Sequence, residues 1–190
     1  MENKITVALI YGSTRAGRFC DKVAAWVGKQ ISAKAEFALD IVDPAYPPAR
    51  ARESEEMYDT VWLRHHMGIA DAFLVVTPEY NHGYPAGLKS LVDSVGAEWQ
   101  AKPVAFVSYG GVSGGLRAVE QLRQVFAELH AVTIRDSVSF ASAWEQFNAD
   151  GTLKSPERAE KQMATVLQRL QWWAVVLRNG RNAIPYTPAA

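Results

Sequence analysis

The stretch from Ile5 to Arg18 limits the possible folds of this chain more than any other. Its first half is the run ITVALIY, which is almost continuously apolar and rich in β-branched residues. Such a run is typical of a strand that is buried on both faces of a parallel sheet. The run ends at Gly12, a polar and cationic turn follows, and an amphipathic segment begins near Phe19. A strand, a polar turn and a helix in this order predict the first βα unit of an α/β fold.

The turn after this first strand combines several groups that bind anions. Its glycines allow the backbone to bend and to approach a ligand closely. Two hydroxyls, two guanidinium groups and the free N–H groups of the following helix are all donors. The residues concerned are Gly12, Ser13, Thr14, Arg15, Gly17 and Arg18. We expect a phosphate monoester here, because an ordinary turn with solvated arginines does not explain why these groups share one short segment.

Two familiar phosphate-binding loops do not match this turn. The P-loop requires Gly-x-x-x-x-Gly-Lys-Ser/Thr, whereas Arg18 follows Gly17 and no Lys-Ser/Thr comes after it. The dinucleotide-binding fingerprint requires Gly-x-Gly-x-x-Gly, and the sequence Gly12-Ser13-Thr14 breaks that pattern.

Apolar runs and helical periodicities continue the alternation to the end of the chain. Further strands are expected at 36–42, 71–77, 102–109 and 131–140, and helices at 19–31, 53–70, 87–95, 116–129 and from 156 to about 180. In the second helix we expect Met57, Val61 and Ile69 to face inward. In the last helix we expect Ser155 to be the cap, with Pro156 at the first helical position.

Five strands alternating with five helices predict one α/β domain over residues 1–190, a three-layer, doubly wound, five-stranded parallel sheet. With the first strand central, the strand order is 2-1-3-4-5, and the switch point lies between the first and third strands. The loops at the carboxyl ends of the strands should therefore line one crevice, where open α/β sheets bind ligands.

Two further loops at this edge carry groups that suit a flat ligand. The third strand ends in TPEYNHGYP, in which two prolines stiffen a loop rich in aromatic and polar groups. The fourth ends in GGVSGG, in which four glycines bring free N–H groups close to a ligand or to a sharp turn. A ligand with a phosphate at one end and a heteroaromatic ring at the other fits all three loops, and FMN is such a ligand.

Composition excludes several other classes of protein. The formal net charge is zero, so no strong field directs the chain to nucleic acid or to a membrane surface. No apolar run reaches membrane-spanning length, and Glu2 and Lys4 lead into the first strand without a signal-peptide pattern. The single cysteine, Cys20, fits a reducing compartment, so a cytoplasmic protein is expected. Its thiol could be activated by the helix dipole and Arg18, but a packed, small apolar residue is the preferred interpretation.

The three loops together resemble those of the flavodoxin-like NADPH-dependent FMN reductases, a family that includes quinone, azo-dye and chromate reductases. The matching segments are GSTRAGR, PEYNHGYPAGLK and SYGGVSGG, in that order over nearly the whole chain. The resemblance implies bound FMN, NADPH or NADH as reductant, a small-molecule acceptor such as a quinone, azo dye, chromate or free flavin, and homodimers or homotetramers. Hydride transfer would be ping-pong at the flavin, with no metal and no catalytic side chain.

The resemblance also carries over specific binding residues. It implies Ser13, Arg15 and Arg18 for the phosphate loop, Pro78, Glu79, Tyr80, Asn81 and His82 for the flavin loop, and Ser108, Tyr109, Gly110 and Gly111 for the third loop, in which the amides of Gly110 and Gly111 would face the pyrimidine carbonyls of the ring. Family members often have proline where this chain has Ala16, which changes the stiffness of the loop but removes no ligand.

Two alternatives remain open from the sequence. A flavodoxin-type electron carrier would share the fold and the FMN, although such carriers are usually acidic and this chain is neutral. A non-enzymatic regulatory protein could use the same crevice as a sensor, with some of the six tryptophans in a partner surface.

Overall fold

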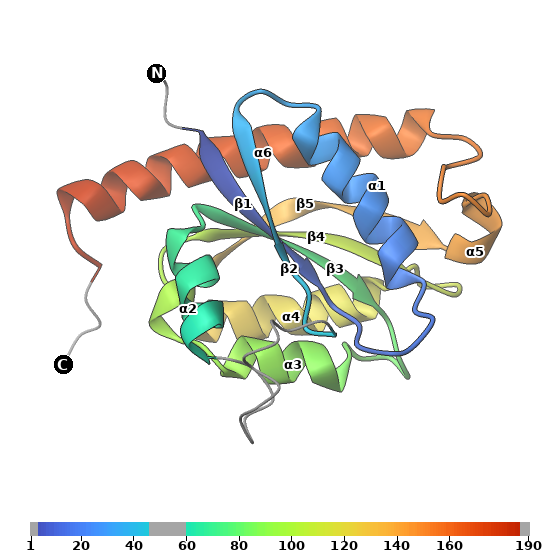
Figure 1. Ribbon diagram of the computed structural model, residues 1–190, viewed down its shortest axis with the longest axis horizontal. Coiled ribbons are helices and arrows are strands. Elements are labelled where there is room, and N and C mark those ends of the chain that lie inside the picture. The colour runs from blue at the N-terminus through green and yellow to red at the C-terminus, as the bar shows by residue number, and fades with distance from the viewer. Residues whose placement is uncertain (1–3, 46–59, 187–190) are drawn as a thin grey trace.

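The computed structural model describes residues 4–45 and 60–186. Strands and helices alternate along the chain, followed by a long C-terminal helix (Figure 1). The elements are β1 (Ile5–Tyr11), α1 (Cys20–Ser32), β2 (Phe37–Val42), α2 (Thr60–Ile69), β3 (Ala72–Pro78), α3 (Ala86–Asp93), the 3₁₀ helix η2 (Ala97–Trp99), β4 (Pro103–Gly110), α4 (Leu116–Glu128), β5 (Val132–Ala141), α5 (Ala143–Gln146) and α6 (Glu157–Ala183).

The five strands form one sheet in the order β2-β1-β3-β4-β5, and every neighbouring pair is parallel. The predicted flavodoxin-like α/β fold and its strand order are therefore confirmed. Every residue of β3 and β4 is buried, as their continuously apolar sequences predict for central strands.

Helices cover both faces of the sheet (Figure 1). Side chains alternate along β1, so that Val7 and Leu9 pack with α1 and α6, while Ala8 and Ile10 pack with α2, α3 and α4. Burying a valine, leucine or isoleucine side chain contributes about 1.5–3 kcal/mol. These two cores fix the sheet, and the loops at the ends of its strands inherit that rigidity.

The inward face of α2 differs from the predicted one. Val61 is 78% exposed and Ile69 is also exposed, whereas Leu63, Met67 and Ala70 are buried. The buried residues follow the i, i+4, i+7 spacing of one helical stripe, and this stripe has a different phase from the predicted one. Met57, which was also predicted to face inward, lies outside the described residues.

The ends of α6 also differ from the prediction. Pro156 is the N-cap residue and no side chain caps the helix, so Ser155 does not have the expected role. The helix continues beyond Gly180 to Ala183. Arg178 and Arg181 explain the extension, because they bind Asp71 and the carbonyl of Ala101 and so outweigh the cost of about 1 kcal/mol for a helical glycine. The short helix α5, which follows β5, was not among the expected helices.

Within the described residues, no helix has both the length and the apolar character needed to cross a bilayer.

Candidate functional site at the carboxyl edge of the sheet

Three loops meet at the carboxyl edge of the sheet, after β1, β3 and β4. Because the strands are parallel neighbours, their carboxyl ends lie side by side. Backbone hydrogen bonds join them there: the N–H of Gly12 donates to the carbonyl of Val76 at 2.8 Å, and the N–H of Glu79 donates to the carbonyl of Tyr109 at 3.1 Å. The convergence predicted from the strand order is therefore present.

The loops after β1 and β3 contact each other through their side chains. The hydroxyls of Ser13 and Tyr80 are 3.0 Å apart, and Ser13 is completely buried. The guanidinium carbon of Arg15 lies 3.7 Å from the centroid of the Tyr80 ring, a cation–π contact. Two hydroxyls and a guanidinium group thus gather at one point, a donor set that suits a phosphate group.

Arg18 has a different position within the same loop. Its side chain is buried, and its guanidinium group donates to the carbonyl of Ser13 and to both carboxylate oxygens of Asp43. Its Nε also donates to Asp21 at 2.7 Å. Burial lowers the pKa of Arg18, but the hydrogen bonds with Asp43 and Asp21 outweigh this effect and raise the pKa above its ordinary value. Arg18 therefore stabilises the loop from its buried side. Its partner Asp43 was not identified from the sequence.

Close backbone packing explains the glycine that ends β1. A Cβ atom on Gly12 would lie 2.5 Å from the carbonyl oxygen of Val76, which is too close for any side chain. A Cβ atom on Gly87, at the start of α3, would lie 2.8 Å from the hydroxyl of Thr14. These two glycines let the loop after β1 pack against β3 and α3.

The loop after β3 is a tight turn. Tyr80 and Gly83 exchange two backbone hydrogen bonds of 2.9 and 3.1 Å, and Asn81 and His82 between them both have positive φ values, 50° and 69°. Asparagine tolerates this left-handed region better than most residues. Pro78 is the buried last residue of β3 and precedes the turn. The turn presents Tyr80 to Ser13 and Arg15.

Glu79 joins this turn to the glycine-rich loop. Its carboxylate accepts hydrogen bonds from the hydroxyl of Ser113 at 2.7 Å and from the Nε and backbone N–H of Arg117 at 2.7 and 3.1 Å. Arg117 also lies 3.0 Å from Nε2 of His82. Desolvation alone would raise the pKa of Glu79, but the hydrogen bonds from Ser113 and Arg117 outweigh it and lower the pKa. Glu79 therefore points toward α4, and its two partners were missed from sequence.

Two glycines of the loop after β4 are required by its geometry. Gly114 and Gly115 have φ values of +59° and +85°, and a Cβ atom on Gly115 would lie 2.7 Å from that of Ser108. The hydroxyls of Ser108 and Ser139 both donate to the carbonyl of Gly114, at 2.8 and 2.9 Å. Ser108 thus fixes the loop. Gly110, the last residue of β4, and Gly111, which follows it, lie at the sheet edge, as predicted from sequence.

The side chains of Tyr109 and Cys20 lie in the core beneath the loops. The ring of Tyr109 packs 5.9 Å from that of Phe19, so only its backbone reaches the edge. Burial raises the pKa of Tyr109 and raises that of the Cys20 thiol to about 11. Cys20 is fully buried, which supports the interpretation of a packed apolar residue and argues against an activated thiolate.

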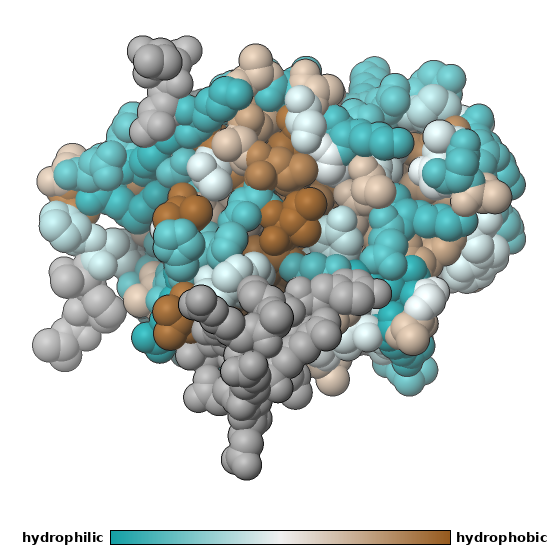
Figure 2. Space-filling model, in the orientation of Figure 1, coloured by the Kyte–Doolittle hydropathy of each residue, from teal (hydrophilic) through white to brown (hydrophobic). Residues whose placement is uncertain are grey.

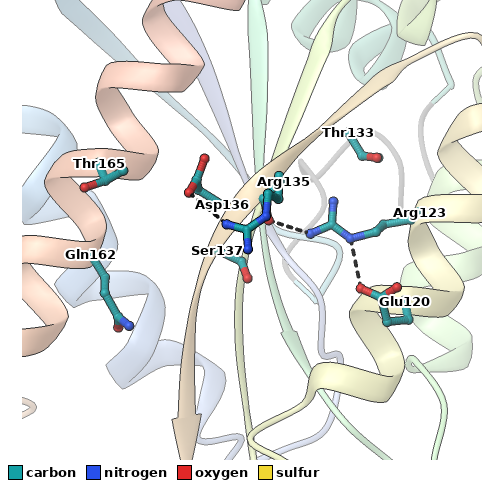
Figure 3. A pocket seen from close by; sticks show the side chains of 8 residues that line it. All are labelled: Glu120, Arg123, Thr133, Arg135, Asp136, Ser137, Gln162 and Thr165. Atoms are coloured by element: carbon teal, nitrogen blue, oxygen red, sulfur yellow. Dashed lines mark hydrogen bonds and ion pairs between the residues drawn. The ribbon is translucent and has the colours of Figure 1, made fainter.

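Another hollow, about 810 Å³, lies away from these loops along the edge strand β5 (Figure 3). Glu120 and Arg123 enter it from α4, while Gln162 and Thr165 enter from α6 on the opposite side. The guanidinium group of Arg123 binds Glu120 and the carbonyls of Ile134 and Arg135. Because these charged groups already pair within the hollow, the carboxyl edge is the stronger candidate site.

The opposite edge of the sheet, formed by β2, carries apolar residues at its surface. Figure 2 shows brown, hydrophobic residues gathered near the middle of this face, over the region of β2 in Figure 1. Ile41 of β2 is exposed, and Asp40 beside it binds Nδ1 of His66 at 2.7 Å. His66 also packs against Trp62, so this histidine is partly packed.

Comparison with known proteins gives a family match. The family model described as NADPH-dependent FMN reductase matches residues 5–145. An NAD(P)H-dependent FMN reductase of Schizosaccharomyces pombe is 36% identical over 135 residues, which cover 64% of this chain and 66% of the relative. A quinone reductase of Escherichia coli K12 is 34% identical over 142 residues, covering 70% of this chain and 76% of the relative.

A similar fold occurs among solved structures. The flavoenzyme NAD(P)H:acceptor oxidoreductase FerB from Paracoccus denitrificans superposes with a TM-score of 0.69 at 23% identity, covering 89% of this chain and 97% of the other. At this identity the similarity concerns the fold.

Proposed function

This chain belongs to the NADPH-dependent FMN reductase family, and on that premise we propose that it passes electrons from NADPH or NADH, through bound FMN, to a small-molecule acceptor. The acceptor classes that we propose are quinones, azo dyes, chromate and free flavin. The observation that carries the proposal is the meeting of Ser13, Arg15 and Tyr80 at the sheet edge where this fold binds ligands.

The residues of the three loops have the chemistry to hold FMN. The Ser13 hydroxyl and the Arg15 guanidinium group would bind its phosphate, with free N–H groups of the loop as further donors. Arg18 was predicted as a third phosphate ligand, but its bonds to Asp43 favour a supporting role, in which it sets the shape of the loop. The ring would lie against the turn from Pro78 to His82.

The glycine-rich loop would recognise the far edge of the ring. The amides of Gly110 and Gly111 would face the carbonyls of its pyrimidine portion, where negative charge develops on reduction. Ser108 and Glu79 hold this loop and the neighbouring turn in place through the carbonyl of Gly114 and the side chain of Ser113. Donors that are fixed in advance stabilise such charge without reorganising.

Bound FMN would supply the difficult chemistry, which is uptake of a hydride from the reductant and return of two electrons to an acceptor. With a quinone, the sum of the reaction is NAD(P)H, a proton and the quinone giving NAD(P)⁺ and the hydroquinone. The three loops would orient the ring, and the reaction requires no side chain to transfer a proton. Release of NAD(P)⁺ before the acceptor binds would make the kinetics ping-pong.

The test is an anaerobic mixture of purified protein, FMN, NADPH and 2-methyl-1,4-naphthoquinone. We expect a yellow protein with flavin absorbance that bleaches on addition of NADPH and recovers on addition of the quinone. Double-reciprocal plots of initial rate against NADPH concentration, made at several quinone concentrations, should give parallel lines if the order is ping-pong. Protein that does not retain FMN, or FMN that stays oxidised with NADPH and NADH, would contradict the proposal.

We also propose that the protein works in the cytoplasm as a homodimer or homotetramer. The single cysteine supports a reducing compartment, and sedimentation velocity of the FMN-loaded protein measures the assembly directly. A monomer at micromolar concentration would contradict the proposed assembly without affecting the proposed chemistry.

A further inference from the structure

The short helix α5 holds one tryptophan against the glycine-rich loop. The indole of Trp144 packs on Gly111: a Cβ atom on that glycine would lie 3.8 Å from Cη2 of the ring. The N–H of Ser142, just before α5, donates to the carbonyl of Gly111 at 2.9 Å. Ser142 has a positive φ of 47°, a conformation that costs a serine about 1 kcal/mol or more. The indole therefore has a fixed position beside this loop.

Two apolar side chains at this point remain open to solvent. Trp144 is 58% exposed and Val112 is 95% exposed. Single exposed apolar residues are common on protein surfaces. These two, however, adjoin Gly110 and Gly111, the residues that we propose for the far edge of the flavin ring. We call Gly111, Val112 and Trp144 the rim.

We propose that the rim contacts the flat, uncharged ring of the electron acceptor, so that Trp144 is a specificity-determining residue for quinone-class acceptors. This inference rests on the proposed function, because it takes the flavin to lie on the adjoining loops. An indole presents a rigid aromatic face that stacks on a quinone ring at little conformational cost.

The charge that α5 itself carries is negative. The charged residue of α5 is Glu145, next to Trp144, and its side chain is exposed. This single charge disfavours the phosphates of NADPH or NADH more than it disfavours a neutral quinone. The cations come from other elements: Arg158 of α6 lines a hollow with Gln146 of α5, while Arg15 follows β1 and Arg117 lies at the start of α4.

The kinetic test compares Trp144→Ala and Trp144→Phe with the unchanged protein, all loaded with FMN. Trp172→Ala is the matched control, because Trp172 is also 58% exposed but belongs to α6. With 2-methyl-1,4-naphthoquinone as acceptor, we expect Trp144→Ala to raise KM about 3- to 10-fold with kcat unchanged. Trp144→Phe should recover part of this loss. KM for ferricyanide, which has no flat apolar ring, should not change in any variant.

A binding measurement gives a readout that does not depend on turnover. We expect the indole N–H signal of Trp144, identified by its loss in Trp144→Phe, to shift in the ¹H–¹⁵N spectrum of the oxidised FMN-loaded protein when the naphthoquinone is added. The indole signal of Trp172 should stay in place.

The outcomes separate this inference from the proposed function. Unchanged protein that neither binds FMN nor reduces the quinone would refute the proposed function. Active protein with the same quinone KM in Trp144→Ala, or with no shift of the Trp144 signal, would refute the role of the rim alone. A lower sedimentation coefficient for Trp144→Ala would also overturn it, because the rim would then be a contact between copies of the chain.

Discussion

The guanidinium group of Arg15 stacks on the ring of Tyr80, with 3.7 Å between the guanidinium carbon and the ring centroid. The two residues come from loops after different strands, and the parallel arrangement of β1 and β3 brings them together. Tyr80 also contacts Ser13, so it connects the proposed phosphate site with the loop proposed for the flavin ring. Changes at Arg15 should therefore affect the phosphate end of the ligand most strongly.

Replacing Arg15 with alanine should weaken FMN binding about 10- to 100-fold, because a charge-assisted hydrogen bond contributes about 1.5–3 kcal/mol. Riboflavin, which lacks the phosphate, should bind the variant and the unchanged protein equally. Flavin fluorescence titration measures both affinities. Arg135→Ala is the control, because it removes the same charge from an exposed position on β5, where the Arg135 side chain is 94% exposed. Equal losses for FMN and riboflavin would show that Arg15 does not bind the phosphate.

Replacing Arg18 with leucine should destabilise the fold by roughly 3 kcal/mol, because it leaves the carboxylate of Asp43 without its partner in a largely buried site. Urea unfolding measures this loss. The double variant with Asp43→Asn should cost less than the sum of the single changes. Arg64→Ala removes a long, 3.9 Å pair between the exposed Arg64 and Glu98 and should change the unfolding free energy by less than about 1 kcal/mol. Additive effects of Arg18→Leu and Asp43→Asn would contradict this coupling.

Glu79 gives a prediction about acid stability. Its pKa is lower in the folded protein than the ordinary value of 4.5, so its ionised form favours folding above that value. This contribution should be lost as the pH falls through the folded pKa, since the carboxylate must then be protonated in both states. The difference in unfolding free energy between the unchanged protein and Glu79→Gln should therefore shrink in acid, as urea unfolding at a series of pH values would show. A difference that does not vary with pH would contradict this linkage.

The thiol of Cys20 should be unreactive in the native protein. Burial raises its pKa to about 11 from 9.0, and the side chain has no access to solvent. Because this is the one cysteine of the chain, labelling with iodoacetamide reports on it alone. We expect slow labelling in buffer and rapid labelling in concentrated urea. Rapid labelling of the native protein would show an accessible thiolate and would revive the alternative of an activated cysteine.

The fold was predictable because its signals are local. The apolar runs that became β1, β3 and β4 need no partner to be recognised, and parallel strands place the loops that follow them at one edge. The side-chain pairs at the site were not predictable in this way. Arg18 binds Asp43 after β2, and Glu79 binds Arg117 at the start of α4, so both pairs depend on how distant segments dock.

Helix phase and length show the same limit. The buried stripe of α2 passes through Leu63 and Met67, because packing against the sheet selects one face among several that the sequence allows. The end of α6 depends on the bond between Arg178 and Asp71. This contact between distant segments outweighs the low helix propensity of Gly180.

Arg123 protects the edge strand β5, and its loss should promote association between chains. Its guanidinium group donates to the carbonyls of Ile134 and Arg135 at 2.7 and 3.0 Å, where the register between β4 and β5 shifts (Figure 3). Exposed backbone groups on an edge strand can pair with a strand of another molecule. Arg123→Ala should therefore lower the unfolding free energy by about 1–2 kcal/mol and start aggregation at a lower temperature, measured by light scattering on heating. Arg135→Ala removes the same charge from the same strand region and leaves those carbonyls covered. If the two variants aggregate alike, net charge and not the uncovered edge controls association.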